Sequence, residues 1–272
     1  MRMMLIPLLT LALTTPALAE RIKDTIDSIS VGNNGEDHLI FLQNGRVLFL
    51  DPREELPKVG QRIEVELDED NKLLSILTLP PKEKATEEKE FSYAMDEDAT
   101  ILDSYGDLTT LFNRMNRSWK ANTECTDRAH IWSYEEWKRS GHVSKKVFLF
   151  FTNTYIRRYN YHWWFHVSPY NLVKDGNSTI EYVVDRKYTS TPRTMKSWTD
   201  IFIKSKRSCP VATYRHYRAN KYGSEHCFAV KSNMYNRLPL HVRNEEDSGR
   251  VQTAFSTSEV NFSYRAFNRR NK

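Results

Sequence analysis

Three residues of the sequence have the types that acyl transfer needs: a cysteine, a histidine and an aspartate. Cys125 stands where a helix is expected to begin, His166 lies in the strand-like run YHWWFHV, and Asp185 ends the run EYVVD. Unpaired backbone N–H groups and the positive dipole end at a helix N-terminus lower the pKa of a thiol. With a histidine base and a carboxylate that orients its ring, such a thiolate attacks carbonyl carbon atoms. The spacing therefore favours a Cys–His–Asp site.

An α+β domain is expected to position these residues. The helix predicted over Cys125–Ser140 ends at Gly141 and turns Ala129, Trp132 and Trp137 toward a core. An earlier helix is indicated by apolar residues at three- and four-residue spacing: Ile101, Tyr105, Leu108, Leu111, Phe112 and Met115. Three runs rich in β-branched and aromatic residues predict strands: Val147–Phe151, Tyr161–Val167 and Ile180–Val184.

A separate all-β domain is predicted over residues 20–80. Asn44-Gly45 lies between two short apolar runs, which is a strong hairpin signal because both turn positions need positive φ. Five strands are expected: Ile26–Val31, His38–Gln43, Arg46–Leu50, Arg62–Leu67 and Leu73–Leu79. We expect them to form a small curled sheet or barrel. The charged segment 81–98, which has no apolar period, reads as a linker to a catalytic domain over residues 99–272.

The first 19 residues have the pattern of a secretory signal peptide. Arg2 gives the positive start, an apolar run follows, and Ala17-Leu18-Ala19 forms a small-x-small cleavage site near Ala19. We therefore expect a secreted or periplasmic protein. The later sequence holds no apolar run long enough for a membrane span.

The net charge of +5, from 40 Lys and Arg against 35 Asp and Glu, is mild. It gives no case for nucleic-acid binding. His216, His226 and His241 lack the spacing of metal ligands, so no metal site is expected.

Several motifs in one order resemble the protein glutaminase (protein-glutamine deamidase) family of papain- and transglutaminase-like cysteine hydrolases. That family's pattern runs Cys-x-x-Arg-Ala-His, a Lys-Val strand, a His-Val strand, a strand ending in Asp, a turn with Pro, and a Trp. This sequence has ECTDRAH, KKVFLF, FHVSPY, YVVDRKYTSTP and Trp198 in the same order, and later the Cys209 segment and KSNMYNRLP. The similarity covers about residues 98–265. Two departures are Arg186-Lys187 directly after Asp185, and the bulky Trp163-Trp164 before His166.

The resemblance implies a papain- or transglutaminase-like core in which Cys125 is the nucleophile, His166 the general base and acid, and Asp185 the residue that orients the imidazole. The implied reaction hydrolyses the side-chain amides of glutamine residues in proteins, through a Cys thioester, to glutamate and ammonia, without a cofactor. The Cys125 N–H is expected to bind the oxyanion, with Asn122 and Trp119 as candidates for the second donor. We expect a monomer whose partners are proteins or peptides with accessible glutamine.

Further residues have predicted roles around this site. Tyr161, Trp163 and Trp164 are candidates for lining the substrate cleft. Arg128 and His130 are expected to fix the packing of the helix. Cys209 and Cys227 are predicted to form a disulfide worth about 3 kcal/mol, which leaves Cys125 as a thiol; the alternative is two unpaired thiols.

Three alternatives stay open on the sequence. A cysteine peptidase or a transglutaminase would have the same triad. A non-catalytic secreted binding protein would bury Cys125 as an inert side chain. The β domain is either a pro-region that covers the cleft, as the resemblance implies, or a binding module that stays attached.

Overall fold

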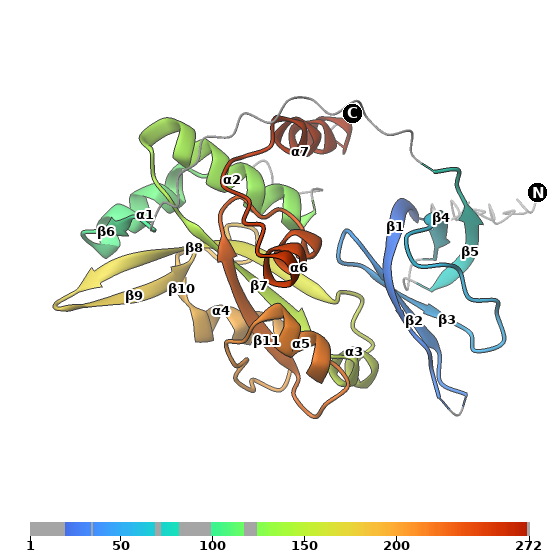
Figure 1. Ribbon diagram of the computed structural model, residues 1–272. Helices are drawn as coiled ribbons and strands as arrows, with labels where there is room; N and C mark the ends of the chain where they lie inside the picture. The colour runs from blue at the N-terminus through green and yellow to red at the C-terminus, as the bar shows by residue number, and fades with distance from the viewer. Residues whose placement is uncertain (1–19, 34, 69–71, 82–98, 117–123, 271–272) are drawn as a thin grey trace, which may run out of the picture.

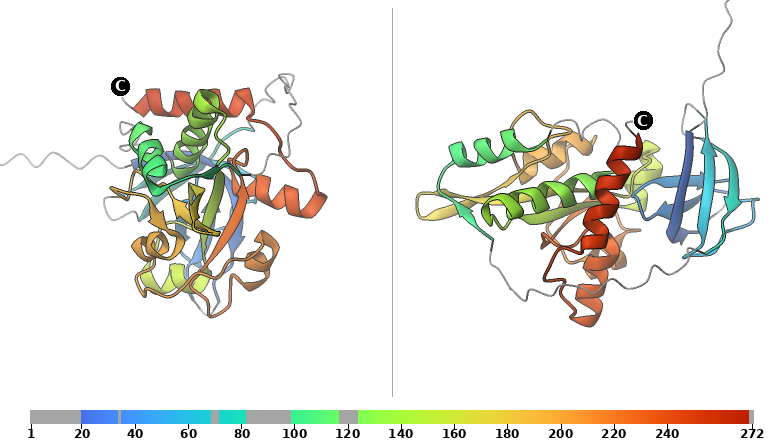
Figure 2. Two further views of the ribbon diagram at one scale, coloured as in Figure 1. Left: turned by 90° about the vertical axis from the view of Figure 1, so that its left-hand side faces the viewer. Right: turned by 90° about the horizontal axis from the view of Figure 1, so that it is seen from above.

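The computed structural model describes residues 20–33, 35–68, 72–81, 99–116 and 124–270. The expected signal peptide, and all of the expected linker except Pro81, lie outside the described residues. The structure has two bodies, an N-terminal sheet and a larger α+β domain, with the sheet at one end of the larger domain (Figures 1 and 2).

The N-terminal sheet has five antiparallel strands in the order β3-β2-β1-β4-β5. The strands are β1 (Glu20–Ser30), β2 (His38–Leu42), β3 (Val47–Leu50), β4 (Arg62–Leu67) and β5 (Leu73–Thr78). The first half of β1 pairs with β4 and the second half with β2, and the register shifts between Ile26 and Ser28. The sheet therefore bends across β1. Within the described residues the edge strands β3 and β5 do not pair, so of the two expected forms, a curled sheet or a barrel, the structure has the open, curled sheet.

The larger domain is built around a six-stranded mixed sheet. Its main path runs β10-β9-β8-β7-β11, and β6 adds to β8 as the parallel strand. The strands are β6 (Ile101–Leu102), β7 (Lys145–Phe151), β8 (Phe165–Asp175), β9 (Ser178–Val183), β10 (Arg193–Thr194) and β11 (Cys227–Asn233). This arrangement is the α+β class that the sequence predicts.

Seven helices surround this sheet in the described part of the chain. They are α1 (Tyr105–Arg114), α2 (Cys125–Ser140), α3 (Asn153–Tyr159), α4 (Met195–Phe202), α5 (Tyr214–Asn220), α6 (Pro239–Ser248) and α7 (Thr257–Arg270). Helix α2 packs across β8, and α7 packs against α2 (Figure 2). Helix α4 contacts β9 and β10. The helix predicted over Cys125–Ser140 has those bounds, and Gly141 ends it at φ 67°.

The aromatic run before His166 is not one strand. Tyr159 is the last residue of α3, which ends because Asn160 takes a left-handed conformation at φ 46°. Strand β8 begins only at Phe165. The residues between them therefore do not follow the two-residue alternation of a strand throughout, and their side chains are placed by tertiary contacts.

Candidate active site

Cys125 is the first residue of α2 and the one cysteine without a disulfide in the structure. The backbone N–H groups in the first turn of a helix have no partner within that helix. Helix α2 brings this end against β8, where the Val167 N–H acts on the Cys125 thiol to lower its pKa. The side chain is buried, with 3% of its surface exposed.

His166 and Asp185 come from neighbouring strands. Strand β8 carries His166, and Asp185 follows the end of β9, which pairs with β8 in antiparallel register. His166 Nε2 lies 2.6 Å from Asp185 Oδ2. The Trp198 indole N–H, from α4, donates to the same oxygen at 3.0 Å. Asp185 thus holds the imidazole through Nε2 while Trp198 fixes the carboxylate.

Cys125 and His166 line one small pocket. Its other lining residues are Arg128, Tyr161, Trp163, Phe165, Lys187, Tyr188 and Phe202. The rings of Phe202 and Tyr188 lie 4.5 and 5.1 Å from the His166 ring, centre to centre. The pocket therefore has aromatic walls around a thiol, an imidazole and two cationic side chains.

Burial dominates the electrostatics of the thiol. It raises the pKa of Cys125 to about 12, although Arg128 and the Val167 N–H act to lower it. The helix N-terminus is expected to favour the thiolate, and in this pocket burial outweighs that effect. Attack by Cys125 therefore requires transfer of the thiol proton to a base.

The pKa values of the histidine and the aspartate are set by burial and by each other. Burial lowers the pKa of His166, and the adjacent Asp185 carboxylate acts in the opposite direction. Burial also acts to raise the pKa of Asp185, but the charge and hydrogen bond of His166, together with Arg128 and Trp198, hold it below its ordinary value. The pair is thus a neutral imidazole beside a carboxylate, which is the state that accepts a thiol proton.

Arg186 is a buried residue next to Asp185 whose contacts the sequence does not predict. Its Nη1 donates to three carbonyl oxygens at the end of α1, those of Phe112, Asn113 and Met115, at 2.5 to 2.7 Å. Its guanidinium also lies over the Phe112 ring. Arg186 therefore ties the turn that carries Asp185 to the C-terminal end of α1.

The residues expected near the site divide between the pocket and its surroundings. Tyr161 and Trp163 line the pocket, whereas Trp164 is 2% exposed, lies outside it and donates its indole N–H to the Leu42 carbonyl. Arg128 lines the pocket, and His130 instead lies 3.1 Å from the buried Lys146 ammonium nitrogen. The oxyanion candidates Trp119 and Asn122 lie outside the described residues.

Lys187, Tyr188 and Phe202 were not predicted to line the site. Lys187 and Tyr188 come two and three positions after Asp185 in the sequence, and this proximity could have indicated that they lie near the site. Phe202 comes from the last turn of α4, and no sequence signal places it beside His166.

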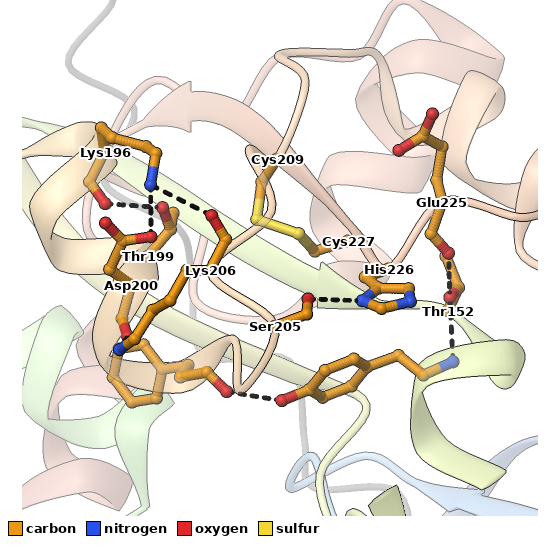
Figure 3. The surroundings of a disulfide bond; sticks show 12 residues. Thr152, Lys196, Thr199, Asp200, Ser205, Lys206, Cys209, Glu225, His226 and Cys227 are labelled. Atoms are coloured by element: carbon orange, nitrogen blue, oxygen red, sulfur yellow. Dashed lines mark hydrogen bonds and ion pairs between the residues drawn. A yellow bond between two sulfur atoms is a disulfide. The ribbon is translucent and has the colours of Figure 1, made fainter. Parts of the chain in front are cut away.

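Cys209 and Cys227 form the expected disulfide (Figure 3). Cys227 is the first residue of β11, and the preceding residue, His226, shares a hydrogen bond of 2.7 Å with the Ser205 hydroxyl. The Tyr155 hydroxyl donates to the Phe202 carbonyl and accepts from the Lys204 N–H. The disulfide therefore tethers the segment that follows α4 and Phe202.

Two searches concern the described residues alone. No group of three or more His, Cys, Asp or Glu side chains there could hold a metal ion. No described helix is both long enough and apolar enough to cross a membrane.

A glutaminase domain is indicated by comparison with known families. Residues 91–202 match the family model described as Glutaminase. This stretch contains Cys125, His166, Asp185 and Trp198. The match confirms the resemblance to the protein glutaminase family that the sequence motifs predict. A glutaminase domain indicates an amidohydrolase and a substrate that bears glutamine.

Several solved structures align with this chain at low sequence identity. The A47Q2 mutant of pro-protein-glutaminase aligns with a TM-score of 0.51 and 14% identity, over 81% of this chain and 85% of that chain. Pro-protein-glutaminase aligns with a TM-score of 0.48 and 14% identity, over 81% and 84%. Protein-glutaminase from Chryseobacterium proteolyticum aligns with a TM-score of 0.39 and 15% identity, over 61% of this chain and 86% of that chain. The similarity to the A47Q2 mutant, with its TM-score above 0.5, shows a shared fold. No curated protein matches the chain.

Proposed function

We propose that this chain is a protein-glutamine deamidase that uses Cys125, His166 and Asp185 as its catalytic triad. The observation that carries the proposal is the His166–Asp185 pair in the same pocket as Cys125, within the stretch that matches the glutaminase family. The substrate is a glutamine side chain in a protein or peptide, and the products are glutamate and ammonia.

The first half of the reaction makes a thioester. Because Nε2 of His166 is bonded to Asp185, Nδ1 is the ring nitrogen left to accept the Cys125 proton. The Cys125 sulfur then bonds to the carboxamide carbon, and the oxygen that gains negative charge is held by the Cys125 N–H at the start of α2. Asn122 and Trp119 remain the predicted second donors. His166 returns the proton to the nitrogen, and the C–N bond breaks to release ammonia.

The second half of the reaction uses water. His166 accepts a proton from a water molecule, whose oxygen bonds to the thioester carbon. The C–S bond then breaks, Cys125 regains its proton, and the substrate leaves with a glutamate side chain. Every step uses residues of this chain, so the proposal requires no cofactor.

The pocket fits a slender side chain better than a bulky one. Tyr161, Trp163 and Tyr188 provide flat apolar walls for the methylene groups of glutamine. Tyr188 also borders a second hollow, of about 350 Å³, whose lining includes Ser190, Arg193 and Asp200. We infer that peptide residues next to the target glutamine lie over this second hollow.

The product separates the deamidase from enzymes with the same triad. Denatured glutamine-rich protein is incubated with the mature chain or with the Cys125→Ala variant, and ammonia and intact substrate mass are measured. Deamidation adds about one mass unit per glutamine and leaves the chain uncut. Peptide fragments would instead indicate a cysteine peptidase, and cross-linked substrate would indicate a transglutaminase.

A non-catalytic binding protein is the alternative that the buried, protonated thiol favours. Alkylation of Cys125 in the native protein distinguishes this alternative from the enzyme. We expect Cys125 to react, because substrate must reach it through the pocket, and Cys125→Ala to take up no label. Complete protection of Cys125 together with absence of ammonia release would overturn the enzyme proposal.

The remaining proposals concern location and the N-terminal sheet. We propose export to the periplasm or beyond the cell, and the Cys209–Cys227 disulfide supports this because such bonds persist in oxidising compartments. For residues 20–80 two hypotheses stand. A pro-region is suggested by the name of the similar pro-protein-glutaminase, and removal would then raise activity. If residues 20–80 are instead a binding module that stays attached, removing them would leave activity unchanged or lower it.

A further inference from the structure

Tyr188 joins the active-site pocket to the second hollow. Its side chain lines the pocket that holds Cys125 and His166, and it also lines the hollow of about 350 Å³ beside α4. Tyr188 is 44% exposed. In the described part of the chain, every residue that lines either space belongs to the larger domain. The path from one hollow to the other therefore runs over the larger domain alone.

A third hollow, of about 240 Å³, lies on another side of Cys125 and is shared by the two bodies. Glu124 and Thr126, the sequence neighbours of Cys125, line it together with residues of the N-terminal sheet that include Asp24 and Gln43. Its charged lining residues are three cations and three acids: Arg21, Lys23, Arg237, Asp24, Glu124 and Asp127. Because these charges are equal in number, the third hollow favours neither an acidic nor a basic peptide.

Positive charge predominates along the path through Tyr188. Four cationic side chains line the pocket and the second hollow: Arg128, Lys187, Arg193 and Lys206. Among the described residues, Asp200 is the single acidic side chain in either lining. Its carboxylate is already paired with the ammonium group of Lys196, which lies one turn earlier in α4 (Figure 3). The cations of the path are therefore not neutralised by acids of the same lining.

Two further carboxylates act on Lys187, and neither lines the second hollow. Asp185 is 1% exposed and is bonded to His166 and Trp198. Glu124 lines the third hollow. Both raise the pKa of Lys187, whereas burial and Arg128 lower it. The charge of Lys187 is thus partly offset, so the two cations of the second hollow carry the argument.

Arg193 and Lys206 are held at fixed points of the second hollow. Arg193 is an exposed residue of β10, whose backbone pairs with Val183 of β9, and it forms no ion pair with another described residue. The Lys206 ammonium donates to the Asp200 backbone carbonyl, and the Lys206 N–H donates to the Ile203 carbonyl. A carbonyl oxygen carries no net charge, so Lys206 keeps its positive charge. Both cations are therefore available to an anion in the hollow.

A carboxylate is the group that such a hollow binds best. The planar guanidinium of an arginine matches a carboxylate with two parallel hydrogen bonds, and an ammonium adds a further donor. The same positive charges repel lysine and arginine side chains, so they discriminate between peptides as well as attract one kind.

We propose that Arg193 and Lys206 select glutamine residues that have an acidic residue close by in the substrate chain. The acidic side chain lies in the second hollow while the glutamine enters the pocket past Tyr188. The preferred substrates are therefore acidic peptides and acidic segments of proteins. This inference rests on the proposed deamidase function, which supplies the glutamine.

The test uses three peptides of equal length, each with one glutamine that is flanked on both sides by Glu, by Lys or by Ser. The value of kcat/KM for ammonia release is measured with the mature chain and with three variants. Arg193→Glu reverses the charge in the hollow, and Arg193→Lys keeps it. Arg250→Glu makes the same change of net charge at an exposed loop position that lines neither the pocket nor the second hollow.

We expect the wild type to prefer the Glu peptide over the Lys peptide about tenfold at low ionic strength. The preference should fall toward one at about 1 M ionic strength, where charges more than about 3 Å apart are screened. Arg193→Lys and Arg250→Glu should keep the preference, and Arg193→Glu should abolish or reverse it. The Ser peptide should react equally with all four proteins, because Arg193 lies outside the pocket.

Three results would overturn the inference. The first is equal kcat/KM of the wild type for the Glu and Lys peptides. The second is a preference that persists in Arg193→Glu, or that Arg250→Glu removes to the same extent. The third is a loss in Arg193→Glu that is as large for the Ser peptide as for the Glu peptide, because Arg193 would then act on the reaction and not on the neighbouring residue.

Binding separates this inference from the proposed function. If the wild type releases no ammonia from any peptide, the deamidase proposal fails, and the dissociation constants of the same peptides, labelled with a fluorophore, are measured with Cys125→Ala. Tighter binding of the Glu peptide that is lost in Cys125→Ala, Arg193→Glu would support an acidic-peptide site without the enzyme. Equal binding of the Glu and Lys peptides, or binding of neither, would overturn the site.

Discussion

The imidazole of His166 and the carboxylate of Asp185 are joined by a hydrogen bond of 2.6 Å in an interior where both side chains are buried. The bond uses Nε2, so Nδ1 is the nitrogen that exchanges a proton with the thiol. Trp198 donates to the same carboxylate oxygen and fixes it from the other side. The orientation of the imidazole is therefore set by two elements, β9 and α4, that lie apart from the nucleophile's helix.

Replacing the carboxylate should disable the imidazole without unfolding the protein. Asp185→Asn keeps the shape but offers no charge to stabilise the imidazolium, and it favours the wrong ring tautomer. We expect kcat for ammonia release to fall by about 10²- to 10⁴-fold, with the far-ultraviolet circular dichroism unchanged. A folded Asp185→Asn variant with kcat within threefold of wild type would contradict the role given to Asp185.

Removing the indole donor should shift the pH dependence of the reaction. Trp198→Phe deletes the N–H that helps to keep the pKa of Asp185 below its ordinary value. The Asp185 pKa then rises, so the carboxylate is lost at a higher pH as the solution is acidified. The acid limb of the kcat/KM profile should move to higher pH in this variant. A limb that stays in place, or moves to lower pH, would rule out this function of Trp198.

Arg186 should contribute to stability through the end of α1. Arg186→Ala leaves three carbonyl oxygens without the guanidinium donor, and hydrogen bonds to a charged group contribute about 1.5–3 kcal/mol each. We expect the free energy of unfolding in urea to fall by about 2 kcal/mol or more. Arg250→Ala, at an exposed loop position, is the control and should change it little. If Arg186→Ala and Arg250→Ala lowered the free energy of unfolding equally, Arg186 would not stabilise the end of α1.

The stability of the N-terminal sheet should depend on the protonation of Asp24. Burial raises the pKa of Asp24 to about 6 from 3.8, although the N–H groups of Asn44 and Thr25 act to lower it. The folded state therefore binds the proton more tightly than the unfolded state. The stabilisation is complete below about pH 4 and is lost as the pH rises through 6. Asp24→Asn should lack this dependence.

The measurement is the free energy of unfolding of wild type and Asp24→Asn at pH 4, 5, 6 and 7. Relative to the variant, the wild type should lose up to about 3 kcal/mol over this range. A difference that is constant with pH, or that grows in favour of the wild type, would show that Asp24 does not titrate in this way.

The disulfide should stabilise the domain and keep Phe202 beside His166. The bond joins cysteines 18 positions apart, and a loop of this size predicts about 3 kcal/mol. The double variant Cys209→Ser, Cys227→Ser should unfold at lower urea concentration and resemble the wild type treated with reductant. Reductant should leave the double variant unchanged. If reduction left the stability of the wild type intact, the assigned contribution would be wrong.

Local signals in the sequence predicted the elements of the site well. The bounds of α2 follow from its apolar spacing and from Gly141, whose positive φ ends the helix. The β2–β3 hairpin follows from Asn44-Gly45, although of these two residues Gly45 alone has a positive φ, of 99°. Such features depend on neighbouring residues in the chain, so a single sequence contains them.

Features that depend on tertiary contacts were not predictable in the same way. Trp163 lines the pocket and Trp164 does not because the hairpin pairs with residues 162–164, which lie far from it in sequence. The burial of Arg186 could not be predicted, because the carbonyl oxygens that it binds at the end of α1 are more than 70 positions away in the sequence. Of the two expected forms of the N-terminal domain, a curled sheet or a barrel, the barrel is not found in the described residues because the edge strands β3 and β5 do not pair with each other.

Hydrolysis of the glutamine amide by Cys125 can be followed through the oxygen atom that water supplies to the product. A glutamine-containing peptide is incubated in ¹⁸O-labelled water with wild type or with Cys125→Ala, and the peptide mass and ammonia are recorded. We expect the wild type to add about three mass units to the peptide per ammonia released, without cleavage, and Cys125→Ala to add none. If ammonia release persisted in Cys125→Ala, or if folded wild type released none, Cys125 would not be the nucleophile of a deamidase.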